Sequence, residues 1–127
     1  MIRLCLAFAL YSAVLPAFAQ PAEVQRTVLI RGDSSTPGHE SVVARVEISS
    51  GAAIGRHTHF GDEIGYVQDG DLEMYVDGEA VRKLKTGDAF IIPEGKVHSA
   101  RNIGNGTAHV IVTYVIAKGK PLAVPVK

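Results

Sequence analysis

Three histidines and one glutamate lie at spacings that would let them bind a single metal ion. His57 and His59 flank Thr58, Glu63 follows four residues later, and His98 comes 98 − 63 = 35 residues after Glu63. On a β-strand, side chains at positions i and i+2 point to one face with Cα atoms ~6.6 Å apart. Both imidazoles can therefore reach one ion at ~2.0–2.1 Å. A turn at residues 60–62 would let Glu63 return a carboxylate oxygen to the same point, which predicts three nitrogen ligands and one oxygen ligand.

The composition of this ligand set restricts the metal. Three imidazoles and one carboxylate suit Fe(II), Mn(II), Ni(II), Zn(II) or Cu(II), and they disfavour Ca(II), Mg(II) and Cu(I). Four protein ligands on an octahedral ion leave about two positions free, as a catalytic site requires. An isolated pair such as His57 and His59 would usually be two surface histidines. The matching positions of Glu63 and His98 favour the metal site instead.

The chain around these residues reads as β-strands joined by turns. Apolar and polar residues alternate, or β-branched residues accumulate, in four runs, at residues 41–48, 71–78, 88–93 and 108–117. Asp-Gly pairs at 69–70 and 77–78 and Asn-Gly at 105–106 are typical of tight hairpin turns. No stretch after residue 19 predicts a helix of three turns. We therefore expect an all-β sandwich or barrel.

The first 19 residues are expected to be a signal peptide that is cleaved. They begin with the positively charged segment Met1-Ile2-Arg3, continue with an apolar run too short to cross a membrane comfortably, and end in Ala17-Phe18-Ala19. Cleavage would leave 127 − 19 = 108 residues, enough for one small domain. The only cysteine, Cys5, would leave with the leader, so the mature protein would have neither a disulfide nor a thiolate ligand.

The expected organisation and charge follow from this division. We expect a signal peptide at residues 1–19, an N-terminal arm or loop at 20–40, a β-barrel at 41–116 and an extended C-terminal tail at 117–127. The 13 basic and 13 acidic residues of the whole chain become 12 and 13 when Arg3 is lost. This balance argues against a nucleic-acid partner. After the leader no stretch could span a membrane, so we expect a periplasmic or secreted protein.

Two motifs carry a resemblance to the cupin superfamily. The first runs from Gly51 through His57-Thr58-His59 and Glu63 to Gly70, and the second from Gly87 through Pro93-Glu94-Gly95 and His98 to Asn102. Every position of both family motifs is present. The resemblance implies a single-domain jelly-roll β-barrel, often dimeric, in which His57, His59, Glu63 and His98 are the metal ligands.

Other conspicuous residues have simpler interpretations. We expect His109 to be a hydrogen-bonded core or supporting residue and not a fifth ligand, and His39 to be exposed. Strand tyrosines such as Tyr66, Tyr75 and Tyr114 could line a pocket but usually pack. Arg45 and Arg101 could bind a carboxylate, although surface pairing is the simpler expectation. Asn102 is expected to hold the turn after His98.

Two functions remain open at this point, because the fold does not select the reaction. The first is a dioxygenase-like oxidoreductase or lyase that acts on a small molecule, with Glu63 as a general base. The second is an exported protein that binds a metal or small ligand without catalysis. A purely structural barrel would not need all four ligand positions.

Overall fold

The computed structural model describes residues 23–127, which form ten strands and no helix. The expected signal peptide, residues 1–19, lies outside the described residues. Within residues 23–127 there is no helix of the length and apolar character needed to cross a membrane. The strands are β1 Val24–Asp33, β2 His39–Ile48, β3 Ala53–Thr58, β4 Gly61–Asp69, β5 Asp71–Val76, β6 Arg82–Lys85, β7 Ala89–Ile92, β8 His98–Asn102, β9 Ala108–Ala117 and β10 Val124–Pro125. The all-β expectation is confirmed.

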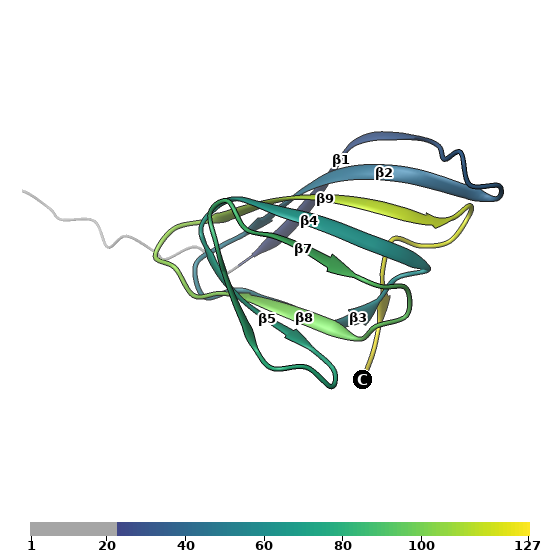
Figure 1. The fold of residues 1–127 in the computed structure, drawn as a ribbon. Helices are drawn as coiled ribbons and strands as arrows, with labels where there is room; N and C mark the ends of the chain where they lie inside the picture. Colours follow the sequence, from purple (N-terminus) through teal and green to yellow (C-terminus); the bar gives the residue numbers. More distant parts are fainter. Residues whose placement is uncertain (1–22) are drawn as a thin grey trace, which may run out of the picture.

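The strands form two antiparallel sheets that face each other (Figure 1). One sheet has the order β1-β2-β9-β4-β7 and the other β10-β3-β8-β5-β6. Strands that follow one another in sequence, such as β3 and β4 or β7 and β8, belong to different sheets. The chain therefore crosses repeatedly between the two layers, and this brings residues 57–63 and residue 98 to one region.

The core lies between the sheets and explains the alternation in the sequence. In β2 and β9 every second residue is buried and the intervening residues are partly exposed. The buried set includes Val42 and Ile48 on β2 and Val112 and Ile116 on β9. Because successive side chains of a strand point to opposite faces, this pattern places one face of the sheet against the core.

Strand β1 corrects the expectation for residues 20–40. An arm or loop was expected there, but Val24–Asp33 pairs along nearly the whole of β2. Most of its residues are exposed, because β1 is the edge strand and covers little of the core. The strand therefore lacks the apolar alternation by which the others could be recognised. The expected C-terminal tail likewise contains a short strand, β10, which pairs with β3.

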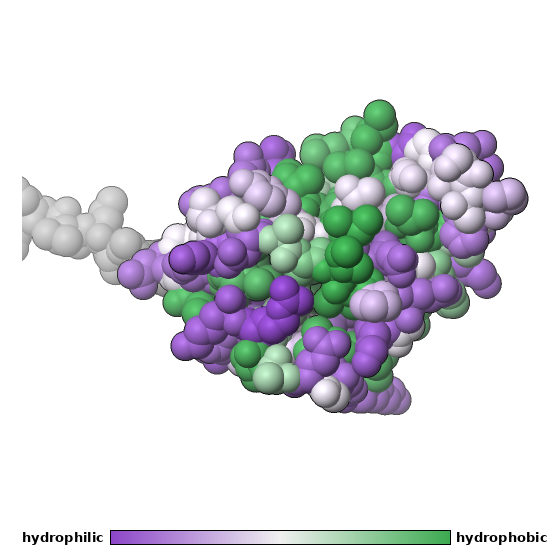
Figure 2. Space-filling view, in the orientation of Figure 1, coloured by the Kyte–Doolittle hydropathy of each residue, from purple (hydrophilic) through white to green (hydrophobic). Residues whose placement is uncertain are grey.

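The outer face of the β1-containing sheet carries a row of residues that crosses all five strands and is apolar on four of them. The paired register places Ile30, Val43, Thr113, Ile64 and Ile91 side by side, in that order. Ile30 and Ile91 are 65% and 61% exposed. Figure 2 shows hydrophobic side chains at the surface over this half of the molecule.

Asn102 ties the loop that follows β8 to the end of β2, and it is 1% exposed. Its side-chain amide donates to the carbonyl oxygens of Ile48 and Gly106, both at 2.7 Å, and its Oδ1 accepts from the amide of Gly104 at 2.8 Å. Both donors of the side-chain amide and its oxygen therefore form hydrogen bonds within the protein. The expectation that Asn102 fixes the turn after His98 agrees with these contacts.

Candidate metal centre

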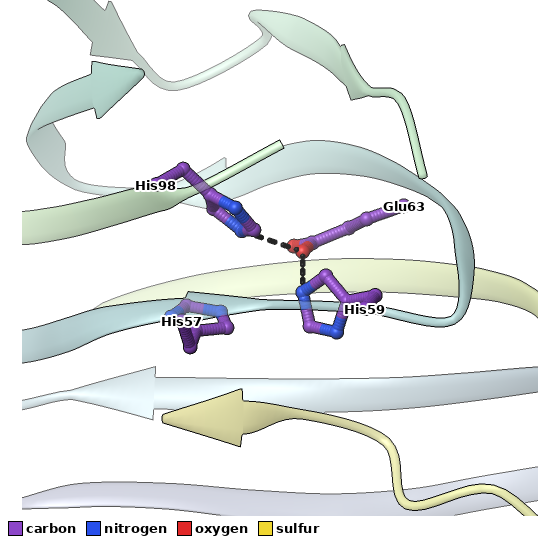
Figure 3. Close-up of side chains that lie close together, drawn as sticks. All are labelled: His57, His59, Glu63 and His98. Atoms are coloured by element: carbon purple, nitrogen blue, oxygen red, sulfur yellow. Dashed lines mark hydrogen bonds and ion pairs between the residues drawn. The ribbon is translucent and has the colours of Figure 1, made fainter. Parts of the chain in front are cut away.

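Both sheets contribute to the cluster of His57, His59, Glu63 and His98. His57 on β3 lies opposite His98 at the start of β8. Glu63 comes from β4 in the other sheet, and His59 from the short connection between β3 and β4. Figure 3 shows the Glu63 carboxylate between the rings of His59 and His98, with His57 beside them. The structure therefore brings together all four residues that the sequence motifs single out.

The connection that carries His59 depends on a close approach at Gly61. A Cβ atom at this position would lie 1.9 Å from the carbonyl oxygen of Val115 in β9. Only glycine therefore lets the chain turn this tightly against β9 before Glu63. On the other side, the amide of Gly95 donates to the carbonyl oxygen of His59 at 3.1 Å. The turn that precedes His98 is thus tied to the connection that carries His59.

The geometry of the cluster fits a single cation. One potential ligand atom from each residue lies within 4.8 Å of all the others. An ion bound at ~2.0–2.2 Å keeps its ligand atoms within ~4.4 Å of one another, so small side-chain movements suffice. Each of the four residues is at most 7% exposed. The four residues could therefore hold a metal shielded from bulk water.

Backbone carbonyl groups fix the orientation of all three imidazoles. The Nδ1 atom of His57 lies 2.7 Å from the oxygen of Gly55, and that of His98 lies 3.0 Å from the oxygen of Lys96. The Nδ1 atom of His59 contacts the oxygen of Leu122. Because a carbonyl oxygen only accepts, each Nδ1 must carry the proton. In a neutral ring this leaves the lone pair on Nε2, which is the arrangement of metal-binding histidines.

Two of these Nε2 atoms face the same carboxylate oxygen, Oε2 of Glu63. His59 Nε2 is 2.6 Å from it and His98 Nε2 is 3.1 Å from it. His59 Nε2 is buried and makes no hydrogen bond within residues 23–127, despite the short distance. A lone pair that faces an anionic oxygen is unfavourable unless a cation or proton lies between them. The chemistry of the donor set therefore favours a bound cation at this point.

The electrostatics of the cluster agree with this interpretation. Burial alone would raise the pKa of Glu63, but the contacts with His59 and His98 outweigh it and lower the pKa to about 2. Burial lowers the pKa of His57. For His98, burial acts in the same direction, but the contact with Glu63 prevails and its pKa is raised. Glu63 is therefore ionised at any physiological pH.

A small cavity lies beside the cluster, between the two sheets. Its volume is about 30 Å³, which gives room for one or two water molecules. Its lining is mostly apolar and includes Phe90, but Arg26 and Tyr114 also contribute. The Tyr114 ring lies 4.9 Å from that of His59, and the guanidinium of Arg26 lies over it at 5.7 Å. Burial, followed by the charge of Glu63, raises the pKa of Tyr114, which stays a neutral hydroxyl.

Several other residues lie away from the cluster. His109 is neither a fifth ligand nor a core residue, because it lies on the outer face of β9, 3.5 Å from Glu47 and 3.7 Å from Asp69. His109 shares a face of β9 with Ile111 and Thr113, as expected, but this is the face directed to solvent. Tyr66, Tyr75 and Arg101 are exposed, Arg45 is partly exposed beside Glu47, and His39 is partly exposed.

Sequence reasoning missed Arg26 and underrated Tyr114. Tyr114 lies opposite Glu63 in the pairing of β4 and β9, and its parity with the buried residues of β9 was a usable signal. Arg26 had no such signal, because β1 does not show the alternation of a strand that packs on the core.

The two-sheet fold and the ligand cluster together point to one family. The family model of the cupin domain matches residues 44–114, which is more than half of the chain. The chain belongs to the cupin superfamily. This cupin has the three histidines and the glutamate of the cluster within the matched region.

Solved structures with similar folds include two of comparable length. An uncharacterized conserved protein with a double-stranded beta-helix domain from Klebsiella pneumoniae subsp. pneumoniae MGH 78578 is 27% identical, with a TM-score of 0.67, over 86% of this cupin and 90% of that chain. KdgF from Halomonas sp. is 28% identical, with a TM-score of 0.58, over 75% of this cupin and 81% of that chain.

A third similar structure is that of an enzyme. Oxalate oxidase in complex with the substrate analogue glycolate is 26% identical, with a TM-score of 0.67, over 84% of this cupin and 57% of the longer chain. No curated protein matches this cupin closely enough to count as a relative.

The affinity of this cupin for a divalent metal should fall as the pH is lowered. The metal must displace the proton from Nε2 of each protonated imidazole, and the raised pKa of His98 makes it the first to hold one. Protonation of Glu63 does not contribute to the pH dependence of metal affinity above about pH 4, because its pKa is about 2. Where one proton on a histidine Nε2 competes with the metal, we expect the affinity for the metal to fall about tenfold for each pH unit. Competition with a chelator between pH 5 and 8 measures this, and constant affinity between pH 5 and 7 would exclude histidine ligation.

Proposed function

We propose that this chain is a metal-dependent cupin enzyme that oxidises a small molecule, with one divalent transition metal held by His57, His59, Glu63 and His98. The ion would be Fe, Mn, Ni, Zn or Cu. The convergence of three Nε2 atoms and one carboxylate in a shielded cluster carries this proposal. The cavity on one side of the cluster supports it, because a catalytic ion needs a face that substrate can reach.

The residues of the cluster have separate roles in this proposal. The bound ion would supply Lewis acidity and, if redox-active, a route for electrons from the substrate to dioxygen. The carbonyl groups of Gly55, Leu122 and Lys96 hold the imidazoles in place. Glu63 would serve as general base after it leaves the ion, because a carboxylate is the most easily exchanged of the four ligands. Leaving His59 and His98 would also remove the contacts that lower its pKa and make it a weak base. The apolar cavity wall excludes bulk water.

A non-catalytic protein that binds a metal or small ligand is the alternative. The cavity beside the cluster is small and largely apolar, and its polar groups beyond the four ligands are Arg26 and Tyr114. Few groups are thus available to move protons during a reaction. The similarity to oxalate oxidase supports the enzyme, but at 26% identity and 57% of that chain's length it does not extend to a substrate.

Elemental analysis and oxygen uptake together separate the two functions. The protein purified from its native compartment is analysed for metal, and the loaded protein is then assayed with flavonols, diketones and small diacids. The enzyme predicts about one ion per chain and oxygen consumption with at least one class, which is lost in His57→Ala. One ion per chain with no turnover on any class would favour the binder, and no bound ion would contradict both the enzyme and a metal-binding protein.

Three further properties stay predictions. Export to the periplasm or outside the cell follows from residues 1–19. A closed jelly-roll barrel, as the family resemblance implies, would be formed by the two observed sheets. A homodimer would cover the row of Ile30, Val43, Thr113, Ile64 and Ile91, of which the three isoleucines are exposed.

A further inference from the structure

A groove at the edge of the molecule leads toward the candidate metal centre. It has a volume of about 330 Å³ and is lined by β1, β3 and the C-terminal segment, including Arg26, Ile54 and His57. The same three residues also line the interior cavity that Glu63 and His98 border. The groove and the cavity are thus neighbours that share one wall. Its size is within the range of small-molecule sites.

Arg26 stands at the boundary between the groove and the cavity. It pairs with Val46 of β2, whose side chain is buried, so the side chain of Arg26 points between the sheets. Its Nε is buried and has no hydrogen-bond partner within residues 23–127. Over the same range no carboxylate forms an ion pair with it. The guanidinium contacts the Tyr114 side chain, over whose ring it lies at 5.7 Å, but this contact neither neutralises its charge nor uses Nε. A buried donor without a partner is costly.

We propose that Arg26 binds the carboxylate of a small organic acid, which enters along this groove and reaches the metal with a second oxygen. The substrate of the proposed enzyme is thereby assigned to the carboxylic acids with an adjacent hydroxyl or carbonyl oxygen. Only the contact between the acid and the metal rests on the proposed function. The first contact, between the guanidinium and a carboxylate, depends on Arg26 alone.

The charges of the groove support an anionic ligand. Arg26 and Arg56 are its charged lining residues, and no acidic side chain borders it. Arg56 is already paired with Asp77 at 2.6 Å, which leaves Arg26 as the available cation. A planar carboxylate matches the two parallel donors of a guanidinium. A phosphate dianion would bring more charge than one guanidinium offsets in an apolar wall, and the inner cavity of about 30 Å³ admits only a small terminal group.

A second explanation for Arg26 is that it protects a free sheet edge. Strand β1 is an edge strand, and natural proteins use inward-pointing charges to prevent edge-to-edge pairing. In that case Arg26→Met would aggregate, and its affinity for a carboxylate would not change. The two roles therefore predict different results for one variant.

The test uses NMR titration of the ¹⁵N-labelled protein, both metal-free and loaded with Zn(II). The probes are 2-hydroxybutanoate, its neutral amide 2-hydroxybutanamide, and inorganic phosphate. The Arg26 Nε–H signal is assigned by its absence in Arg26→Lys. We expect 2-hydroxybutanoate to shift this signal in both forms, more tightly with Zn(II), and the amide and phosphate to bind at least tenfold more weakly.

Two variants complete the experiment. Arg26→Met should lower the affinity for 2-hydroxybutanoate roughly 10- to 100-fold and leave the affinity for Zn(II) unchanged. Arg31→Met is the matched control, because Arg31 lies on the same strand, pairs with the inward-facing residue Val42 and is bound to Glu40 at 3.3 Å. It should change neither affinity.

The outcomes separate this inference from the proposed function. Zn(II) binding without any response of Arg26 to the acid would overturn the inference and leave the metal centre intact. A response of Arg26 in a protein that binds no Zn(II) would support the carboxylate site and contradict the proposed enzyme. Equal binding of acid, amide and phosphate, or an unchanged affinity in Arg26→Met, would also overturn the assignment.

Discussion

The variant His98→Ala should bind divalent metal at least ~100-fold more weakly than the parent protein, because mutating groups that merely support a ligand already costs ~10–100-fold. His98 is 4% exposed and comes from the sheet opposite Glu63. Its loss leaves His57 as the one ligand from that sheet, together with His59 and Glu63. Water would have to take the vacant position in a cluster closed to solvent. His57→Ala should have a similar effect.

Isothermal titration with Zn(II) or Mn(II) measures this loss. His109→Ala is the matched control, because His109 is also a strand histidine beside carboxylates, Glu47 and Asp69, but lies on the outer face. It should keep the parent affinity. If His98→Ala bound the metal as tightly as His109→Ala, the ion would be elsewhere in the protein and the cluster would not be its site.

Asn102→Asp, which replaces the side-chain nitrogen by oxygen, should strongly lower the stability of the fold. The side-chain amide of Asn102 donates to two carbonyl oxygens at 2.7 Å, those of Ile48 and Gly106. An aspartate would place a carboxylate oxygen against both of them in a site that is 1% exposed. A buried charge without a partner costs about 3–5 kcal/mol. We expect the free energy of unfolding to fall by about this amount.

Urea unfolding followed by circular dichroism tests this expectation, with the metal removed so that ligand binding does not contribute. Asn105→Asp makes the same chemical change three residues away, where the side chain is exposed. It should shift the unfolding free energy by less than about 0.5 kcal/mol. Equal effects of the two substitutions would mean that Asn102 does not hold the loops together.

The sequence predicted that His57 and His59 lie together because the chain stays extended from the end of β3 to His59, so both side chains point the same way. His57 and His59 are separated by two, the period of a strand, and the runs at 41–48 and 108–117 show the same period in their apolar residues. Sheets with one buried face leave this signal in the sequence. The family motifs added His98, which no local periodicity connects to His57.

The entrance to the site was less predictable, since its residues lie on edge strands. Residues of β1 are exposed on both faces, and β10 has two residues, so neither leaves an alternating pattern. Arg26 on β1 consequently went unnoticed, although it lines the cavity. Leu122 also went unnoticed, because it lies in the irregular segment before β10, where its carbonyl accepts the Nδ1 proton of His59. For His109 the period of two correctly predicted that it shares a face of β9 with Ile111 and Thr113. It could not predict that this face is the solvent-exposed one.

The three carbonyl groups that receive the imidazole Nδ1 protons have a consequence for metal exchange. Gly55, Lys96 and Leu122 hold the rings through the main chain, so no side-chain substitution can abolish these contacts directly. An arriving ion thus meets rings whose rotation is already restricted, and the entropy lost on coordination is correspondingly small. Different divalent ions would then meet the same preformed set of donors, and the supply of ions in the compartment where the protein takes up its metal would decide which of them it carries.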